Sequence, residues 1–408
     1  MTATDPRTPR YLDLEDSYAA HNYQPLDIVI ARAAGVWVWD VEGNKYLDCL
    51  ASYGALNQGH NHPRIIQALV EQAKTLTLTS RAFRNNRLGP FCEKLAKLSS
   101  YEKVLMMNTG TEAVETAIKA ARRWGYREKG IAEDAAEIIV FDGNFHGRTT
   151  TIVSFSSDPG ARRGYGPYTP GFVSVRFGDL DEVRHAITGN TCAVLVEPVQ
   201  GEAGVVVAPE GFLPGLRELC DKEHVLLICD EIQSGLGRTG RLFAHTREGV
   251  RADAVVIGKA LSGGLYPVSA FLADSNVMDV FDPGSHGSTY GGNPLACAVA
   301  EAALDVLLEE KLVERAEQLG AFLAERLGRI RSEIVKEIRC VGLWAGIELY
   351  PEAGGARRFT EALRGDGLLL KETHEHTLRL APPLVITKEE LELACEKLDR
   401  VLTRHLQP

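Results

Sequence analysis

The sequence predicts an α/β protein with a large domain, whose mainly parallel sheet has helices on both faces, and a smaller α+β domain. Short, continuously apolar runs alternate with helical patterns through most of the chain, as expected for parallel strands joined by helical crossovers. After residue 293 the pattern changes to long helices with few strands. A chain of 408 residues is long enough for two structural domains.

The first expected elements are a β-hairpin and a helix. Residues 36–39 and 45–47 are strand-like runs on either side of the turn at 41–44. Pro63 suits the first turn of a helix, which we expect to run to about Leu76.

The middle of the chain repeats a strand and helix alternation. Thr109 and Glu112 have the spacing of a capping box, which predicts a helix directly after a strand at 103–107. A further helical pattern covers residues 213–223. The other expected strands cover residues 137–141, 172–175, 193–196, 225–228 and 254–257.

The C-terminal part has the pattern of a smaller domain. Pro294 opens an Ala- and Leu-rich helix, and a second helix is expected at 312–330. Strands near 343–349 and 368–370 precede a last helix at 388–405. We therefore expect three segments. Residues 1–60 contribute to the small domain, residues 61–300 form a large cofactor-binding domain, and residues 301–408 form the C-terminal small domain.

Composition excludes several classes of partner. The 55 acidic and 45 basic residues give a net charge of −10, which argues against nucleic acid, because a phosphate backbone needs a basic face. The eight cysteines contain no C-x-x-C pair, which favours reduced thiols and a cytoplasmic protein. The first fourteen residues are polar, and eighteen consecutive apolar residues occur nowhere, so we expect no signal peptide and no membrane span.

Lys259 is the strongest catalytic candidate. It follows the apolar run 254–257 and precedes the glycines Gly263 and Gly264. Chemistry in open α/β sheets gathers at such strand ends. A lysine held there loses water, so its neutral, nucleophilic form becomes accessible, as a Schiff-base lysine requires. The alternative is an ordinary surface lysine at the end of a strand.

Asp230 ends the preceding apolar run. It lies twenty-nine residues before Lys259, about one strand with its connection, so neighbouring strands can direct an acid and an amine into one crevice. A pyridoxal phosphate (PLP) site needs this pair, a lysine for the aldehyde and a carboxylate that keeps the pyridine nitrogen protonated. The alternatives are a structural ion pair or an aspartate that caps a turn.

Other motifs allow a functional and a structural interpretation. Residues 109–111 fit a phosphate cradle or a plain helix cap. Residues 144–148, with Phe145 and Arg148, fit a ring-stacking and carboxylate-binding segment or a polar surface turn. The G-x-G-x-x-G at 235–240 opens no helix, so we interpret it as a glycine-rich loop. Histidines 60, 62, 374 and 376 lack metal-ligand spacing, and we expect no metal site.

Together, several motifs resemble the class III PLP-dependent aminotransferases from about Tyr23 to the C-terminus. Within that class the chain is most similar to the ornithine δ-aminotransferases. The motifs that carry the resemblance cover residues 51–53, 57–60, 80–83, 144–148, 197–207, 230–233, 258–270, 287–294 and 379–386.

The resemblance implies a fold-type I homodimer, or a higher homo-oligomer, with active sites at the subunit interface. Lys259 then carries PLP, and Asp230 pairs with its pyridine nitrogen. The resemblance also implies roles for further residues: ring stacking by Phe145, contact with the phenolic oxygen by Gln233, phosphate binding by Gly110, Thr111 and the partner subunit's Thr289, substrate carboxylate binding by Tyr53 and Arg148, and a switchable ion pair between Glu202 and Arg379.

The reaction implied is transfer of the δ-amino group of L-ornithine to 2-oxoglutarate, giving glutamate 5-semialdehyde and glutamate. One residue departs from the pattern: Arg84 stands where the similar enzymes usually have tyrosine, which leaves room for another ω-aminotransferase, acting on acetylornithine, lysine or 4-aminobutyrate. A PLP-dependent racemase or aminomutase, and a non-catalytic PLP-binding regulator, are the remaining alternatives.

Overall fold

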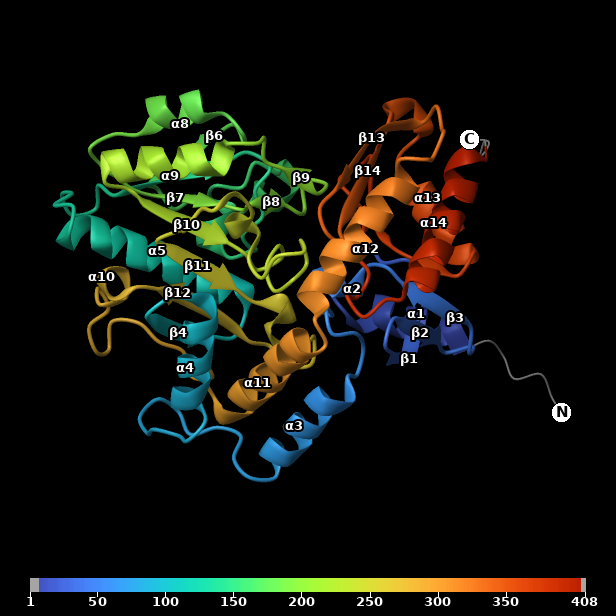
Figure 1. The fold of residues 1–408 in the computed structure, drawn as a ribbon, viewed down its shortest axis with the longest axis horizontal. Helices are drawn as coiled ribbons and strands as arrows, with labels where there is room; N and C mark the ends of the chain where they lie inside the picture. Colours follow the sequence, from blue (N-terminus) through green and yellow to red (C-terminus); the bar gives the residue numbers. More distant parts are fainter. Residues whose placement is uncertain (1–6, 405–408) are drawn as a thin grey trace.

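The computed structural model describes residues 7–404 as a larger and a smaller region that lie side by side (Figure 1). The larger region is built on a central sheet whose strands follow the order β4 (Lys103–Met107), β12 (Ser269–Ala273), β11 (Ala254–Ile257), β10 (Leu226–Asp230), β7 (Thr191–Val196), β5 (Glu137–Phe141) and β6 (Phe172–Val175). Strands β11, β10, β7, β5 and β6 are parallel. Strand β12 is antiparallel to both of its neighbours.

Both faces of this sheet are covered because successive strand residues point to opposite sides. Val255 and Ile257 belong to one hydrophobic core, whereas Ala254 and Val256 belong to another. The second core includes the apolar face of α5 (Gly110–Arg127), with Ala117 among its buried residues. The first core includes α9 (Phe212–Glu223) and α11 (Pro294–Glu309). The sheet is therefore buried on two sides, as its continuously apolar strands predict.

The larger region contains further helices and 3-10 turns. They are α3 (Pro63–Ala73), α4 (Leu88–Ser99), α6 (Thr150–Val153), α7 (Pro159–Arg162), α8 (Leu180–Ala186) and α10 (Ser275–Met278), with the 3-10 turns η1 (Ala244–Glu248) and η2 (Lys259–Ser262). The capping box predicted at Thr109 is present: its side chain accepts from the N–H of Glu112, whose carboxylate accepts from the N–H of Thr109.

The smaller region combines both ends of the chain. One sheet has the order β1 (Ile30–Ala34), β2 (Trp37–Asp40), β3 (Lys45–Asp48), β15 (Leu368–Leu369), and a second has the order β13 (Val335–Cys340), β14 (Ala345–Leu349), β17 (Thr377–Leu380), β16 (Lys371–Thr373). The helices here are α12 (Leu312–Leu327), α13 (Arg357–Gly365) and α14 (Lys388–Thr403), together with the 3-10 turn η3 (Pro351–Ala353). The pairing of β3 with β15 supports the predicted contribution of residues 1–60 to the small domain, although the domain limits stay a prediction.

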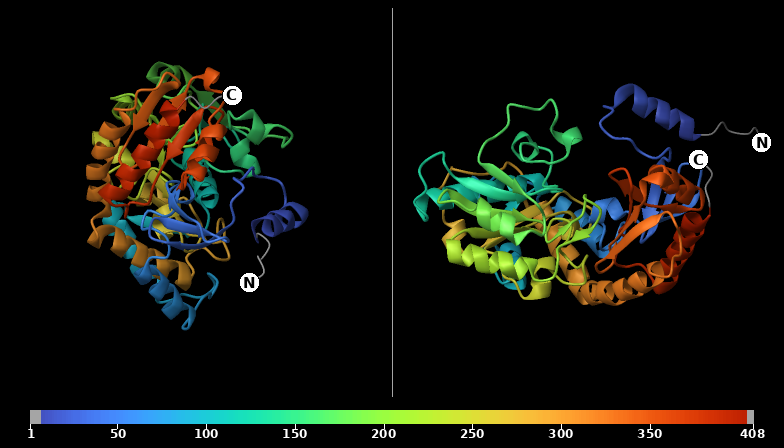
Figure 2. Two further views of the ribbon diagram at one scale, coloured as in Figure 1. Left: turned by 90° about the vertical axis from the view of Figure 1, so that its right-hand side faces the viewer. Right: turned by 90° about the horizontal axis from the view of Figure 1, so that it is seen from above.

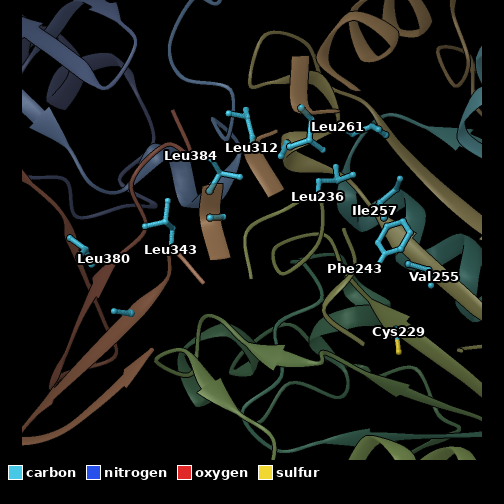
Figure 3. Close-up of a cluster of buried hydrophobic side chains, with 14 of the residues drawn as sticks. Cys229, Leu236, Phe243, Val255, Ile257, Leu261, Leu312, Leu343, Leu380 and Leu384 are labelled. Carbon is cyan, nitrogen blue, oxygen red and sulfur yellow. The ribbon is translucent and has the colours of Figure 1, made fainter. Parts of the chain in front are cut away.

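One apolar core continues between the two regions. Figure 3 shows Val255 and Ile257 of the large sheet, Leu236 of the glycine-rich loop and Leu312 of α12 leading toward Leu343, Leu380 and Leu384 of the smaller region. The short ribbon β8 (Val199–Gln200) with β9 (Val206–Val207) also lies between them, packed through Val199 against Trp344. The two regions are therefore joined by packed apolar side chains.

Most predicted elements are present, with ends that differ by a few residues. Helix α3 ends at Ala73 rather than Leu76, and α12 ends at Leu327 rather than residue 330. The expected end of the last helix, at 405, lies outside the described residues. Among the elements that were not predicted, α1 (Arg7–Tyr18) has no buried residue and extends away from the body (Figure 2). Within residues 7–404, no helix combines the length and apolarity needed to cross a membrane.

Candidate active site

Asp230 and Lys259 meet at the carboxyl ends of neighbouring strands. Asp230 is the last residue of β10 and pairs with Val256 of β11. Lys259 opens η2 immediately beyond β11, with a φ of 43°. Both side chains line a cavity of about 200 Å³, which we call the inner cavity. The strand-end interpretation is therefore correct in its geometry, since an acid and an amine face one space.

Asp230 is buried, and each of its carboxylate oxygens has one neighbour. Its Oδ2 lies 2.6 Å from Nδ1 of His146, and its Oδ1 accepts the backbone N–H of Ile232 at 3.0 Å. Burial alone would lower the pKa of His146, but the hydrogen bond and charge of Asp230 raise that pKa above its usual value. Nε2 of His146 is buried without a hydrogen-bond partner among the described residues. The pair therefore places a carboxylate, oriented by an imidazole, at the base of the inner cavity.

Lys259 is a desolvated amine that faces both acids and arginines of the site. Burial lowers the pKa of its amine, and the carboxylate of Glu202 offsets this only in part. No hydrogen bond or ion pair to its Nζ occurs within residues 7–404. A desolvated amine without a partner gives up its proton readily, which a nucleophilic lysine requires.

Glu197 is a buried acid that the sequence analysis did not assign a role. It follows β7 directly and lines the inner cavity. Its Oε2 accepts the backbone N–H of Phe145 at 2.9 Å, and burial raises its pKa to about 8. The strand-end signal that identified Asp230 and Lys259 was also present here, because Glu197 ends an apolar run.

The start of α5 forms an anion cradle beside the inner cavity. Gly110 and Thr111 line that cavity at the first turn of the helix, where backbone N–H groups lack helical partners. Gly147 closes the cradle with a φ of 130°, and a Cβ at this position would lie 1.7 Å from Oγ1 of Thr111. Only glycine fits there. The capped helix start therefore presents unpaired backbone N–H groups to the inner cavity.

A second cavity of about 740 Å³, the outer cavity, adjoins the inner one at Lys259 and Phe145. Tyr53, Arg148, Glu202 and Arg379 line it. The guanidinium of Arg148 lies 5.5 Å from the Phe145 ring centroid. Two arginines facing one space can bind a substrate with two carboxylates.

Glu202, which is half-buried, and Arg379, which is buried, form an ion pair in the outer cavity. Nη1 of Arg379 donates to Oε1 of Glu202 at 2.6 Å, and the arginine is 1% exposed. Burial would raise the pKa of Glu202, but the charges of Arg379 and Lys259 lower it below its usual value. Nε of Arg379 is buried without a partner among the described residues. This arginine therefore keeps a free donor edge beside its carboxylate.

Gln233 lies where the inner cavity meets residues of the outer cavity. It lines the inner cavity, but its Nε2 donates to the Tyr53 carbonyl oxygen at 3.1 Å and to Oε1 of Glu202 at 3.3 Å. It therefore connects the two cavities, and contact with a phenolic oxygen stays a prediction.

Tyr53 lies on an unusual turn, α2 (Ala51–Gly54). Its φ is 60°, and the φ values of Ala51 and Ser52 are 48° and 49°. For residues with a Cβ such left-handed backbone costs roughly 1–2 kcal/mol each. The Tyr53 ring centroid lies 5.2 Å from Cζ of Arg379. The substrate side of the site is therefore built on strained backbone.

Two residues singled out from the sequence lie elsewhere in this chain. Thr289 and Arg84 are exposed and line neither cavity. The four histidines form no metal-ligand cluster within residues 7–404. His60 pairs with Asp48, and His62 pairs with Glu310.

Comparison with known proteins agrees with this geometry. The aminotransferase class-III family model matches residues 18–402. The chain belongs to the class-III aminotransferases.

Relatives of this aminotransferase match it over nearly their full length. It is 56% identical to "Ornithine aminotransferase 2" of Staphylococcus aureus, with 97% of this chain and 99% of the relative covered. An ornithine aminotransferase structure from Toxoplasma gondii, with PLP at partial occupancy in its active site, is 44% identical with a TM-score of 0.96 and covers 97% of this chain and 94% of that chain. An acetylornithine aminotransferase structure from Elizabethkingia anophelis is 48% identical with a TM-score of 0.88 and covers 97% and 98%.

Proposed function

We propose that this aminotransferase binds PLP through Lys259 and transfers the δ-amino group of L-ornithine to 2-oxoglutarate, giving glutamate 5-semialdehyde and glutamate. The observation that carries the proposal is the position of Lys259, whose unpaired amine lies where the two cavities meet. One cavity has the groups for a phosphate and a ring nitrogen, and the other has the groups for substrate carboxylates.

The inner cavity fits PLP by its chemistry. The α5 start with Gly110, Thr111 and Gly147 suits the phosphate, and the Asp230 carboxylate suits a protonated ring nitrogen. Phe145 lines both cavities and is placed to stack on the ring, and Gln233 is the candidate for the phenolic oxygen. When bound, PLP supplies the electron sink that stabilises negative charge at the substrate carbon.

The protein's own groups then handle the protons. Once the substrate amine has displaced Lys259, the freed neutral amine would take the proton from the substrate carbon as a general base and return it as a general acid. Asp230, oriented by His146, favours a proton on the ring nitrogen. Burial of these groups excludes water, which strengthens each electrostatic interaction.

The outer cavity accounts for two different substrates at one site. Tyr53 and Arg148 bind the carboxylate of ornithine, while Glu202 neutralises Arg379 and so removes a cation near the amino donor. Released from Glu202, Arg379 binds the second carboxylate of 2-oxoglutarate through its bidentate edge.

We also propose a homodimer, or a higher homo-oligomer, in the cytoplasm. Thr289 is exposed in one chain, which supports its predicted role on the phosphate of the partner's site. Tyr11, Tyr18, Phe83 and Tyr290 are exposed aromatic side chains that a partner subunit could cover. All eight cysteines are unpaired, as expected of a reducing compartment.

A donor panel tests the reaction. Ornithine, acetylornithine, lysine and 4-aminobutyrate are compared with 2-oxoglutarate as acceptor, in the wild type and in Arg84→Tyr. We expect ornithine to have the highest kcat/KM, and Arg84→Tyr to change it by less than about threefold, because Arg84 lines neither cavity of its own chain and the other residues of the ornithine-type pattern are present. A preference for acetylornithine that moves to ornithine in the variant would support the activity named for the Elizabethkingia relative instead. Product formation without 2-oxoglutarate would indicate a racemase or aminomutase.

A further inference from the structure

The turn that carries Tyr53 requires an external support. Every residue of α2 has a positive φ, and Gly54 alone among them lacks a Cβ. A short run of residues in the left-handed conformation is not favoured by the backbone itself, so contacts with surrounding residues must stabilise it. These contacts decide where the Tyr53 side chain lies.

Asp48 supplies such contacts at the entry to the turn. Its Oδ1 accepts the backbone N–H groups of Leu50 at 2.9 Å and Ala51 at 3.0 Å. Its Oδ2 lies 2.7 Å from Nε2 of His60, and the aspartate is 7% exposed. Because both carboxylate oxygens are engaged, the plane of the carboxylate is fixed, and with it the direction in which the chain enters the turn.

His60 is itself fixed by backbone contacts. Its N–H donates to the carbonyl of Gly35 at 2.7 Å, and its carbonyl accepts from the N–H of Gly35 at 3.0 Å. Gly35 lies between β1 and β2. The turn is therefore tied through Asp48 and His60 to the N-terminal sheet.

At its exit the turn is held against the substrate site. The N–H of Ala55 donates to the carbonyl of Ala51 at 2.9 Å, and Gln233 donates to the carbonyl of Tyr53 at 3.1 Å. The Tyr53 ring, 5.2 Å from Cζ of Arg379, faces the outer cavity. Relaxation of the turn would move this ring relative to Arg379.

We propose that Asp48 and His60 are positioning residues that hold the Tyr53 turn and thereby set the selectivity for ornithine. The inference rests on the proposed function, since Tyr53 is taken to bind the ornithine carboxylate. Loss of the support weakens ornithine binding more than glutamate binding, because Arg379 anchors a further carboxylate of glutamate. The turnover number changes less than KM, since neither residue lines the inner cavity.

The first experiment compares Asp48→Ala with Asp48→Asn. We expect Asp48→Ala to raise the ornithine KM about tenfold or more and the glutamate KM less than about threefold. Asparagine keeps an oxygen for the two N–H groups and offers its amide N–H to His60, so it should stay within about threefold of the wild type. Equal KM changes for both substrates in Asp48→Ala would overturn the proposal.

A matched control is available in the same sheet. Asp40 is 8% exposed and accepts the N–H groups of Glu42 at 3.0 Å and Asn44 at 2.8 Å, but it supports the β2–β3 turn. Asp40→Ala should lower thermal stability without raising the ornithine to glutamate KM ratio. A raised ratio would mean that general weakening of this sheet explains the effect. His60→Ala serves if Asp48→Ala does not fold, with the same selective KM change expected.

A rescue experiment tests whether relaxation of the Tyr53 turn causes the expected KM change. Ser52 is exposed, and no hydrogen bond of its side chain occurs within residues 7–404. Glycine adopts the backbone conformation of Ser52 without a Cβ penalty. Adding Ser52→Gly to Asp48→Ala should therefore return the ornithine KM most of the way to the wild-type value. No recovery would show that the turn's conformation is not what Asp48 holds.

Amide hydrogen exchange provides a readout that does not depend on turnover. In Asp48→Ala apoenzyme and holoenzyme, a peptide covering residues 49–56 should exchange faster by about tenfold, while α5 is unchanged. This result holds whether or not ornithine is the donor, so failure of the donor panel and failure of the support are distinguishable. Unchanged exchange in this peptide would overturn the inference.

Discussion

The inner and outer cavities adjoin at Lys259 but are constructed differently. Strand ends of one sheet, Asp230 of β10 and Lys259 beyond β11, meet the α5 start in the inner cavity. The outer cavity combines Tyr53, Glu202 and Arg379, which lie far apart in the sequence and on separate small elements. Asp230 and Lys259 thus lie at the ends of adjacent strands of one packed sheet, whereas the outer cavity combines segments from both regions of the molecule. Substrate preference can therefore change without disturbing the chemistry.

The largest expected effect comes from breaking the junction of the two cavities. Lys259→Ala removes the amine that both cavities share, and turnover should fall by about ten-thousandfold or more, because nucleophile and proton carrier are lost together. Steady-state rates with ornithine and 2-oxoglutarate measure this. Borohydride reduction of the wild type should fix PLP to the peptide that contains Lys259. Fixation to another lysine would contradict the assignment.

A smaller effect is expected from the base of the inner cavity. Asp230→Asn keeps the shape but loses the charge, so the chemical step should slow by about a hundredfold or more for every donor alike. Single-turnover absorbance changes with ornithine and with glutamate measure the step. Near-normal rates in this variant would remove Asp230 from the proposed role.

In the outer cavity, selectivity rather than rate should change. Glu202→Ala leaves Arg379 permanently charged and unpaired, so kcat/KM should fall about tenfold or more for ornithine, because a free cation disfavours the donor. Glutamate should be used as well as before or better. Half-reaction kinetics with each substrate decide this, and equal losses for both would mean that the ion pair is structural.

The smallest expected effect is on stability and pH. Glu197 has a pKa of about 8 in the folded protein but 4.5 as an ordinary carboxyl, so unfolding releases its proton between about pH 5 and 8, and stability falls as pH rises. The raised pKa of His146 acts in the same direction, because its contribution is present below pH 6.5 and is lost above the folded pKa.

The Tm of Glu197→Gln should therefore increase relative to that of the wild-type apoenzyme as pH rises. We expect the Tm difference to move by about 2–4 °C or more in favour of the variant from pH 5 to pH 8. Thermal unfolding at constant ionic strength measures it, with Glu102→Gln as an exposed control. A Tm difference that does not vary with pH would show that Glu197 is ionised in the folded protein.

The same contrast explains what could be predicted from the sequence. The large sheet was predictable because its buried strands are continuously apolar runs, and the strand-end rule then led to Asp230 and Lys259. Strand β12 was missed because Ser269–Ala273 is a short run, and neither its composition nor the preceding Gly263, Gly264 and Pro267 shows that it runs antiparallel to its neighbours. Helix α1 was missed because it has no buried face.

The outer cavity was accessible only through family resemblance. The residues before Tyr53 give no glycine signal for a left-handed turn, which tertiary contacts of Asp48 impose. The contacts of Gln233 with Glu202 and Tyr53 depend on side-chain positions in three separate segments, which no local pattern records. Arg379 lies on a four-residue strand, which is too short for an alternation of apolar and polar residues to be recognised.

The pairing of β3 with β15 has a consequence for biosynthesis. Leu47 pairs with Leu368, so the first sheet to emerge from a ribosome cannot be completed until almost all of the chain has been made. Closing such a long loop is slow and comes late, whereas the large sheet can form from residues already synthesised. Asp48, which supports the Tyr53 turn, pairs with Leu369 in the same ladder. Completion of the sheet that carries this support is therefore expected to be a late step of synthesis.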